Sequence, residues 1–588
     1  MLEATARDGH ARILRWSPSD DQAATTPTLI VPVTGDSPVP AWAEVLLADE
    51  ADPERITLVS DGTWFHPRGA QGNLVVHAPQ PTATHQVQVM EVGDELAVFH
   101  DAGGWASNPQ RLVPAFIEAK AQAGAGRAFW APALGTPADY AVWTYVGVDL
   151  FDASPLLLAA VRGEALTVDG PLPLAEAEAL YGDGETWDVD RLMAFNLDQA
   201  RQELKRIHAA IQKGQLRALA ERRCYASPES VALLRRFDRQ HGHLEGATAA
   251  RREEDVPCMT QESLWAPAVE RFRRKFQDQY VPPPTADTLV LLPCSARKPY
   301  RLSTSHRYFQ RALDDSGMRH RCHEVMVTSP LGLVPRDLED TYPANRYDVP
   351  VTGHWNRDEE AIIRYQLAAL LERGDYKHVV AHVSASTYTF LRDLLPDGTH
   401  HTGHSHHVQS KADCDRLRDT LRAIRDADKQ PSDRAMWSLR KRDDLQAMLS
   451  YQVGPGAAEA LVEGAKAHGK VPFVKLVRDG TQLGMTTIDR GLMSFTIDGA
   501  DVVAAHETKR VFIEDFWPRK TGSLFAVGVS HADADVREGD DVSVCFQGPD
   551  GVEVRACGIA QMSGPEMADM KRGVAVTLRH VRKEGGVS

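Results

Sequence analysis

A stiff proline-rich segment divides this chain and limits how it can fold. Residues 281–287 read Val-Pro-Pro-Pro-Thr-Ala-Asp, and three successive prolines suit neither a helix interior nor a central strand. The segment is therefore predicted to be a linker between two folded regions. The chain has 588 residues, which is too many for one hydrophobic core, so we expect three to five domains.

The region before the linker alternates short apolar runs with helical stretches. Residues 28–33 and 95–99 are predicted strands, residues 112–123 a helix, and residues 143–148 a further strand. This alternation is typical of an α/β layer or barrel. Residues 189–239 are predicted to be helical and are rich in Arg and Lys. Such charged faces are most often simply solvated, so RNA contact is the less favoured interpretation there.

The region after the linker predicts a small doubly wound parallel sheet. Residues 288–293 form an apolar run that suits a short buried strand, and residues 357–373 show the apolar spacing of a helix with one buried face. Strands and helices alternate over about 150 residues, as in doubly wound sheets. The other elements predicted here are a helix over 305–316, strands over 324–328 and 377–384, and a helix over 385–395.

Composition favours a reduced, cytoplasmic protein. The net charge is −15, which excludes a generally basic nucleic-acid coat but leaves room for a local RNA-binding face. The seven cysteines are scattered and form no C-x-x-C pair. The first twenty residues lack an apolar signal core, and no apolar run is long enough to span a membrane. We therefore expect no membrane partner.

One segment concentrates reactive side chains at the carboxyl end of the first strand after the linker. Ligands of open α/β sheets bind at this end of the strands. Backbone N–H groups, a following helix and the positive charges expected on Arg297, Lys298 and His306 should lower the pKa of the Cys294 thiol. A small core residue is the alternative interpretation of this cysteine, and both stay open. The catalytic candidates are Cys294, Lys298, Tyr300, Ser303 and His306, with Ser303 also suited to cap the next helix.

A long loop over residues 328–355 follows the second strand. Loops of this length inside a compact domain are usually functional or disordered, and its aromatic and acidic residues suit a pocket for a planar base and an amine. A histidine tract over residues 400–407 is interpreted as a solvated polar loop, and no metal site is expected there. The substrate-binding candidates of the long loop are Ser329, Glu339, Asp340, Tyr347 and Asp348.

Residues 293–306 fit the pattern P-C-x₃-K-P-Y-x₂-S-x₂-H, which resembles the signature of the archaeosine synthase family, archaeal paralogues of tRNA-guanine transglycosylase. The similarity covers most of the chain. Other segments that resemble this family are residues 327–335, 347–353, 147–152, 194–223, 451–461, 489–492, 512–516, 525–529, 562–564 and 570–576.

The resemblance implies a multidomain α/β protein with four parts. Residues 1–280 are expected to form a degenerate transglycosylase-like (β/α) barrel, and residues 285–430 a small doubly wound α/β catalytic domain. Residues 435–506 are expected to form an α+β domain, followed by a β-barrel PUA RNA-binding domain over residues 507–588. The RNA-binding candidates in the PUA domain are Lys509, Arg510, Lys571, Arg572 and Arg579.

Departures from the transglycosylase pattern imply that the first domain has lost its original activity. Residues 180–196 contain no cysteine, and Phe195 replaces the ligand histidine before Asn196, so zinc is expected to be absent. The base-exchange motif survives only as Asp-Ala-Gly-Gly-Trp-Ala at residues 101–106. This domain is therefore expected to bind or scaffold tRNA, and no other cofactor is expected.

The resemblance also implies the reaction. Free lysine would add to the nitrile of 7-cyano-7-deazaguanine at position 15 in the tRNA D-loop, and a radical-SAM partner would then release archaeosine. Glu339, Asp340 or Asp348 could hold the lysine, and Cys294 could either form a transient thioimidate or leave the amine to attack directly. Two alternatives remain: a transglycosylase using Asp101 or Asp152 as nucleophile, and a non-catalytic tRNA-binding subunit. The sequence also allows a homodimer.

Overall fold

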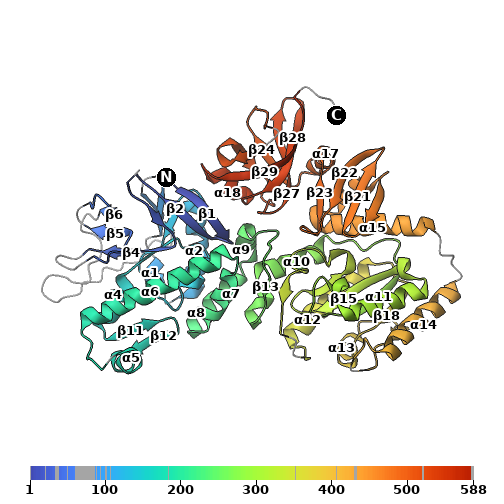
Figure 1. The fold of residues 1–588 in the computed structure, drawn as a ribbon, viewed down its shortest axis with the longest axis horizontal. Helices are drawn as coiled ribbons and strands as arrows, with labels where there is room; N and C mark the ends of the chain where they lie inside the picture. The colour runs from blue at the N-terminus through green and yellow to red at the C-terminus, as the bar shows by residue number, and fades with distance from the viewer. Residues whose placement is uncertain are drawn as a thin grey trace. The chain divides into compact units, whose positions relative to one another are not determined.

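The computed structural model describes residues 2–19, 21–33, 39–48, 51–59, 87, 89–92, 94–99, 102–105, 108–182, 184–350, 353–405, 407–428, 434–519 and 522–584. The chain forms two compact units (Figure 1). The first comprises Met1–Ala249 with Phe525–Val527 and Pro565–Val574, and the second comprises the rest. No helix among the described residues has the length and apolar composition of a membrane span.

The first unit is built on a curled sheet of seven strands. Their order is β6-β5-β4-β10-β9-β8-β7, and every neighbouring pair is parallel except β7 with β8. The last of these strands in the sequence, β10, pairs with the first, β4, as in a closed barrel. Among the described residues, β6 and β7 form the two edges of the sheet and do not pair with each other. The strands are β4 (Thr28–Pro32), β5 (Val45–Ala48), β6 (Ile56–Val59), β7 (Val89–Val92), β8 (Leu96–Phe99), β9 (Ala128–Trp130) and β10 (Leu150–Asp152).

The helices of the first unit largely follow the sequence prediction. The expected helical regions appear as α2 (Pro109–Ala123), α6 (Val189–Gln212), α7 (Leu216–Cys224) and α8 (Pro228–Asp238). The strand predicted over residues 143–148 is wrong, because residues Tyr140–Tyr145 form helix α3. All six residues of α3 are buried, so no polar face distinguishes a helix from a strand in this short apolar run.

Many Arg and Lys side chains of these helices are used inside the unit. Arg217 of α7 forms ion pairs with Glu221 and Asp238, and Arg223 pairs with Glu203 of α6. These two arginines are largely buried in ion pairs, so they do not form the solvated face that the sequence favoured.

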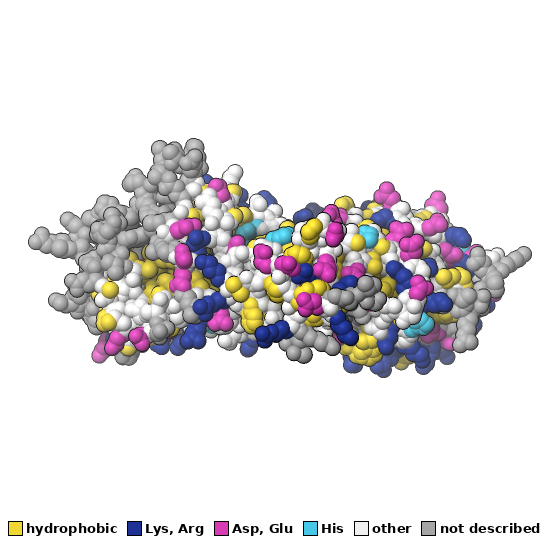
Figure 2. Space-filling view, turned by 90° about the horizontal axis from the view of Figure 1, so that it is seen from above, with side chains coloured by type: hydrophobic (Ala, Val, Ile, Leu, Met, Phe, Trp, Pro, Cys, Tyr) yellow, Lys and Arg dark blue, Asp and Glu magenta, His cyan; other side chains and the backbone are white. Residues whose placement is uncertain are grey.

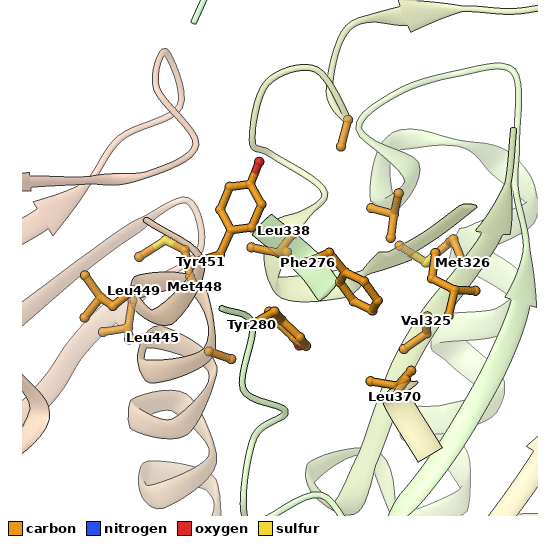
Figure 3. Close-up of a cluster of buried hydrophobic side chains, with 14 of the residues drawn as sticks. Phe276, Tyr280, Val325, Met326, Leu338, Leu370, Leu445, Met448, Leu449 and Tyr451 are labelled. Carbon is orange, nitrogen blue, oxygen red and sulfur yellow. The ribbon is translucent and has the colours of Figure 1, made fainter. Parts of the chain in front are cut away.

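A helix near the start of the second unit contributes to the core of the central domain. Helix α10 (Pro267–Asp278) precedes the proline-rich linker, and its Phe272 and Phe276 belong to the same buried cluster as Leu289 and Leu291 of the central sheet. Figure 3 shows Phe276 and Tyr280 among residues of that core. Residues 267–280 therefore pack with the domain that follows the linker.

The central sheet has the order β16-β15-β14-β18-β19. Strands β14 (Thr288–Pro293), β15 (Cys322–Thr328), β18 (His378–Ala381) and β19 (His400–His401) are parallel, and β16 (Gly332–Pro335) is an antiparallel edge. Helices α10 and α12 (Arg357–Arg373) lie on one side, and α11 (Thr304–Ser316) and α14 (Lys411–Asp428) on the other (Figure 1). The predicted doubly wound arrangement is confirmed, with α13 (Ala385–Leu391) shorter than predicted.

Helix α14 (Lys411–Asp428) had not been predicted, and α15 (Arg434–Val453) begins the region that was expected to form an α+β domain. Helix α14 packs against α11, and Leu445, Met448 and Leu449 of α15 belong to the buried cluster that includes the central sheet. Figure 3 shows these three side chains on α15. Helix α15 joins α16 (Pro455–Val462), α17 (Ile497–Ala505) and a four-stranded sheet of β20 (Lys466–Lys470), β21 (Phe473–Arg478), β22 (Thr481–Thr486) and β23 (Met493–Phe495).

The C-terminal region is β-rich, as predicted. Its six strands have the order β25-β29-β28-β27-β24-β26 and form a half-barrel sheet. Strand β24 runs parallel to β27, and the pairs β24–β26, β27–β28 and β28–β29 are antiparallel. The strands are β24 (Arg510–Ile513), β25 (Ser523–Phe525), β26 (Val529–Ala532), β27 (Asp541–Gly548), β28 (Gly551–Ala560) and β29 (Val574–Val581).

Candidate active site

The carboxyl ends of the two central strands bring the candidate cysteine next to a threonine. Pro293 of β14 lies opposite Val327 of β15 in the parallel register. Cys294 and Thr328, the next residue on each strand, therefore lie at the same edge of the sheet. The Thr328 hydroxyl lies close enough to the thiol to favour its ionised form. Thr328 had not been singled out from the sequence, although its place at the end of a predicted strand was a usable signal.

Three buried hydroxyl groups form a chain from this point. Thr328 Oγ1 and Tyr347 Oη are 2.5 Å apart, and Tyr347 Oη and Tyr300 Oη are also 2.5 Å apart. Tyr347 is held in place because its short strand β17 (Tyr347–Asp348) pairs with β13 (Val256–Pro257). The structure thus connects two predicted residues from separate loops, Tyr300 and Tyr347, through direct hydrogen bonding.

The environment of Cys294 differs from the sequence expectation. Burial raises the pKa of its thiol, and the hydroxyl of Thr328 and the charge of Lys298 oppose that rise without cancelling it. The predicted lowering of the pKa was wrong because desolvation of the thiolate outweighs the nearby cation. Cys294 is therefore a neutral thiol near neutral pH.

Lys298 lies within the same cluster. Its Nζ is 3.8 Å from the centroid of the Tyr347 ring, which is a cation–π contact. Burial lowers the pKa of Lys298, opposed by the nearby Cys294 and by the carboxylate of Asp348. An ammonium group with a lowered pKa transfers a proton more readily near neutral pH.

Ser303 and His306 support the loop that carries the cysteine. Ser303 Oγ caps α11 by accepting a hydrogen bond from the His306 backbone N–H at 3.2 Å, as the sequence suggested. The His306 ring is fully buried: Nε2 donates to the Pro293 carbonyl at 3.0 Å, and Nδ1 accepts from Arg336 at 3.0 Å. Burial and Arg336 lower the pKa of His306 to about 3, so the expected positive charge on this histidine was wrong.

Glu339 and Asp340 lie away from this cluster in a network of ion pairs. Arg301 Nη1 is 2.5 Å from Asp340 Oδ1, and the Arg301 backbone N–H donates to Glu339 Oε2 at 2.9 Å. Arg336 donates to Glu339 at 2.9 Å and pairs with Glu324 at 2.7 Å. Burial raises the pKa of Glu339, whereas Arg336 and Arg319 lower that of Glu324 to about 2.

The other two substrate candidates flank the cysteine cluster. Ser329 follows Thr328 and is half-buried, and its carbonyl accepts a hydrogen bond from the Thr328 hydroxyl at 3.2 Å. Asp348 is exposed, and its backbone carbonyl accepts from the Cys258 N–H at 2.7 Å. Its carboxylate is close enough to affect the pKa of Lys298.

In the first unit, two residues at positions that correspond to the transglycosylase motifs form local hydrogen bonds. Asp152 is buried and accepts hydrogen bonds from the backbone N–H groups of Ala133 and Ser154 at 2.6 and 3.1 Å. Asn196 bonds through Oδ1 to the Leu166 N–H at 2.7 Å. Asp101, the other nucleophile considered, lies outside the described residues.

Three of the five PUA cations are neutralised within their own domain. Lys509 is buried with Nζ 2.7 Å from Asp540, Arg510 lies 3.0 Å from Asp533, and Arg579 pairs with Asp541. Lys571 and Arg572 have exposed side chains. Figure 2 shows basic and acidic side chains interspersed over the face it presents, so net charge alone does not mark an RNA-binding face.

The histidine tract is engaged in local contacts. The His401 ring stacks on Tyr388 with centroids 4.0 Å apart, and His404 Nε2 bonds to the His401 carbonyl at 2.9 Å. His406 lies outside the described residues. Within the part of the chain that the structure describes, no group of three or more His, Cys, Asp or Glu residues is arranged to hold a metal ion.

Comparison with known proteins gives matches along the whole chain. A model described as a domain of unknown function, DUF5591, matches residues 269–421, and a PUA domain model matches residues 510–582. The archaeosine synthase of Haloferax volcanii is 30% identical over 609 aligned positions, covering 99% of each chain. Archaeosine synthase subunit alpha of Methanosarcina acetivorans is 34% identical over 514 aligned positions, which cover 83% of this chain and 80% of the relative. A tRNA-guanine(15) transglycosylase of Methanobrevibacter smithii is 25% identical over 483 aligned positions, which cover 76% of this chain and 66% of the relative.

Proposed function

The chain belongs to the archaeosine synthase family, and on that premise we propose that it adds free lysine to the nitrile of 7-cyano-7-deazaguanine at position 15 in the tRNA D-loop. It is an enzyme of tRNA modification in archaeosine biosynthesis, with the deazaguanine-bearing tRNA as substrate. The family resemblance of the P-C-x₃-K-P-Y motif is thereby confirmed. The lysine donor, the site of attack and the roles of individual residues are the parts proposed here.

The reaction is an addition without a leaving group. The neutral amine of lysine forms a new C–N bond to the nitrile carbon, and one π bond of the nitrile becomes a lone pair on its nitrogen. That nitrogen takes up a proton, the attacking nitrogen loses one, and the product is an amidine. The site therefore needs a proton donor for the nitrile nitrogen and a group that accepts the amine proton.

Lys298 beside Cys294 is the observation that carries this proposal. Its half-buried ammonium group lies at the carboxyl end of the sheet and has a lowered pKa, which suits a donor to the developing negative charge. The hydroxyl chain of Thr328, Tyr347 and Tyr300 orients Cys294 and supplies further hydrogen-bond donors. His306 is assigned a positioning role, because both of its ring nitrogens are already bonded.

We favour direct attack by the amine over a thioimidate intermediate. A thioimidate requires thiolate at Cys294, whereas burial raises the pKa of this thiol. The neutral thiol can instead donate a weak hydrogen bond near the nitrile. Intact-protein mass spectrometry of the enzyme quenched during turnover tests this choice. A covalent adduct of the deazaguanine base on Cys294 would overturn direct attack.

The proposed function is tested by mass spectrometry of nitrile-bearing tRNA incubated with the enzyme and one amine at a time. A nucleoside heavier by one lysine is expected with L-lysine, and no change is expected with glutamine or ammonium. Guanine exchange into unmodified tRNA would instead favour the transglycosylase alternative. Binding of tRNA without any product, with every amine supplied, would favour the non-catalytic subunit.

The lysine adduct still has to be converted to archaeosine. In this proposal a separate radical-SAM partner carries out that step, as the family resemblance implies. The exposed Lys571 and Arg572 of the PUA domain are the retained candidates for phosphate contacts with tRNA.

A further inference from the structure

A cavity of about 310 Å³ lies in the second unit, between the central domain and α15, apart from the cysteine cluster. One wall comes from β15 and the turn after β16, and the opposite wall comes from α15 and the β21–β22 region. Leu445 and Met448 of α15 also line the cavity, and Figure 3 shows both side chains on this helix. The charged lining residues are Arg301, Arg319, Arg336, Arg440, Lys441, Glu324, Asp337, Glu339, Asp340 and Asp444.

Each of the four arginines of this cavity forms an ion pair with one of its carboxylates, and Lys441 donates a hydrogen bond to the Gly469 carbonyl. Two carboxylates, Asp337 and Asp444, have an oxygen that can accept a further hydrogen bond. Arg440 Nε is 2.6 Å from Asp444 Oδ1, which leaves the second oxygen of that carboxylate for another donor; the Asp444 side chain is 40% exposed. Asp337 accepts a hydrogen bond from Tyr280 through Oδ1 at 3.1 Å, and its Oδ2 has no hydrogen-bond partner among the described residues. The Asp337 side chain is only 5% exposed.

Burial raises the pKa of three carboxylates that line the cavity. Burial and the charge of Asp444 raise the pKa of Asp337 to about 7. Burial also raises the pKa of Asp444 and Glu339, although each has an arginine partner. A bound cation would relieve this unfavourable burial of negative charge. Leu445, Met448 and Val474 add an apolar surface that suits an aliphatic chain.

We propose that this cavity binds the free amino acid that donates the amine, with its α-ammonium group between Asp337 and Asp444 and its aliphatic side chain along Leu445 and Met448. The proposal deepens the proposed function and rests on it for the identity of the donor. An ammonium held by two carboxylates stays protonated and is not nucleophilic, so the reacting amine is the one at the far end of the side chain. Arg301, which also lines the cavity, directly follows Tyr300 of the cysteine cluster.

The test measures binding by titration calorimetry, using the full-length protein with tRNA that carries guanine, so that no reaction occurs. The probes are L-lysine, L-norleucine, which keeps the α-ammonium but lacks the terminal amine, and 6-aminohexanoate, which lacks the α-ammonium. We expect L-lysine and L-norleucine to compete for one site and 6-aminohexanoate to bind at least about tenfold more weakly.

Two variants locate the site. Asp444→Asn and Asp337→Asn are each expected to weaken L-lysine binding about tenfold or more, because each removes a charged partner of the ammonium. Asp393→Asn is the matched control, since Asp393 is a carboxylate of the same domain that pairs with Arg364 and does not line the cavity. If Asp337→Asn does not fold, Asp444→Asn and the wild-type probe series still decide the question.

The outcomes separate this proposal from the proposed function. Undiminished L-lysine binding in Asp444→Asn, or no L-lysine binding to the wild-type protein with tRNA present, overturns the cavity as the donor site even if lysine is incorporated into nitrile-bearing tRNA. Binding that is lost in both variants, without any lysine incorporation by the wild-type enzyme, supports the cavity and contradicts the proposed reaction.

Discussion

The cysteine cluster and the charged cavity are two polar regions of one unit with opposite electrostatics. The cysteine cluster holds a neutral thiol, three hydrogen-bonded hydroxyl groups and one lysine whose pKa is lowered by burial. The cavity holds interleaved arginines and carboxylates, with Asp337 lacking a full set of partners. In our proposal the two regions have separate roles. The hydrogen-bond donors of the cysteine cluster face the uncharged nitrile, and the carboxylates of the cavity hold a charged amino acid.

The largest effect is expected from removing the cation of the cysteine cluster. Lys298→Ala should lower kcat roughly 10²–10³-fold, as loss of a donor to a developing anion does in other enzymes. The lysine KM should change little, because the cavity is intact. Single-turnover transfer of lysine to nitrile-bearing tRNA measures this rate.

Lys377→Ala is the matched control for this change. Lys377 belongs to the same domain, and its side chain is 58% exposed with Nζ 3.7 Å from Asp287. Its removal should leave the rate unchanged. Full activity of Lys298→Ala would remove the lysine from the reaction and with it the assignment of the cysteine cluster.

Gly491→Ala should disturb the cavity without touching the cysteine cluster. Gly491 lines the cavity with φ of +64°, and a Cβ there would lie 1.8 Å from the Asp340 carbonyl oxygen. The strained backbone and the clash should together destabilise the protein by about 2 kcal/mol or more. Thermal unfolding and the lysine KM measure the two consequences. Unchanged stability and KM would show that this contact does not shape the cavity.

Lysine affinity should depend on pH through Asp337. Its pKa of about 7 in the empty cavity means that a cation binds the ionised form and displaces a proton, so affinity is lost as the pH falls through 7. Between pH 8 and pH 6 the affinity should fall roughly tenfold. The groups that face Asp337 are Tyr280, His323, Tyr376, Arg440 and Asp444.

Calorimetry in two buffers of different ionisation enthalpy reports the released proton directly. His323 does not titrate in this range, because burial lowers its pKa to about 3. Burial raises the pKa of both tyrosines. Asp337→Asn should flatten the profile, and a profile that keeps its slope in this variant would assign the titration to another group.

The smallest effect is expected in the PUA domain. Changing both Lys571 and Arg572 to Ala should weaken tRNA binding and reduce the slope of log affinity against log salt by roughly one to two. Lys509→Ala should instead lower stability, because this buried lysine pairs with Asp540. Filter binding at several salt concentrations separates the two, and an unchanged salt slope in the double variant would exclude these contacts.

The sequence predicted the parts of the fold that depend on local apolar patterns. Strands β14 and β15 and helix α12 were predicted because their buried residues are periodic or contiguous. Helix α3 was assigned as a strand, because long-range packing rather than a polar face defines it. The sequence could predict that Tyr300 and Tyr347 lie at the same edge of the sheet, because their loops follow adjacent parallel strands. It could not predict the direct hydrogen bond between them.

The electrostatics of the site could not be predicted from residue types. Lys298 and the loop suggested a thiolate at Cys294, but burial raises the pKa of the thiol. His306 looked like a cation, yet its place beside Arg336 in a dry interior keeps it neutral. The sequence did not indicate a role for Asp337. Its proposed role depends on one carboxylate oxygen that has no hydrogen-bond partner among the described residues, in a cavity partly formed by α15.

Steady-state kinetics test most directly whether the cysteine cluster and the cavity have separate roles. The wild-type enzyme, Lys298→Ala and Asp444→Asn are compared, with L-lysine varied at saturating nitrile-bearing tRNA. The account predicts that Lys298→Ala lowers kcat with little change in the lysine KM, and that Asp444→Asn raises the lysine KM while kcat at saturation is largely kept. Parallel losses of kcat in both variants, with the lysine KM unchanged in each, would contradict it.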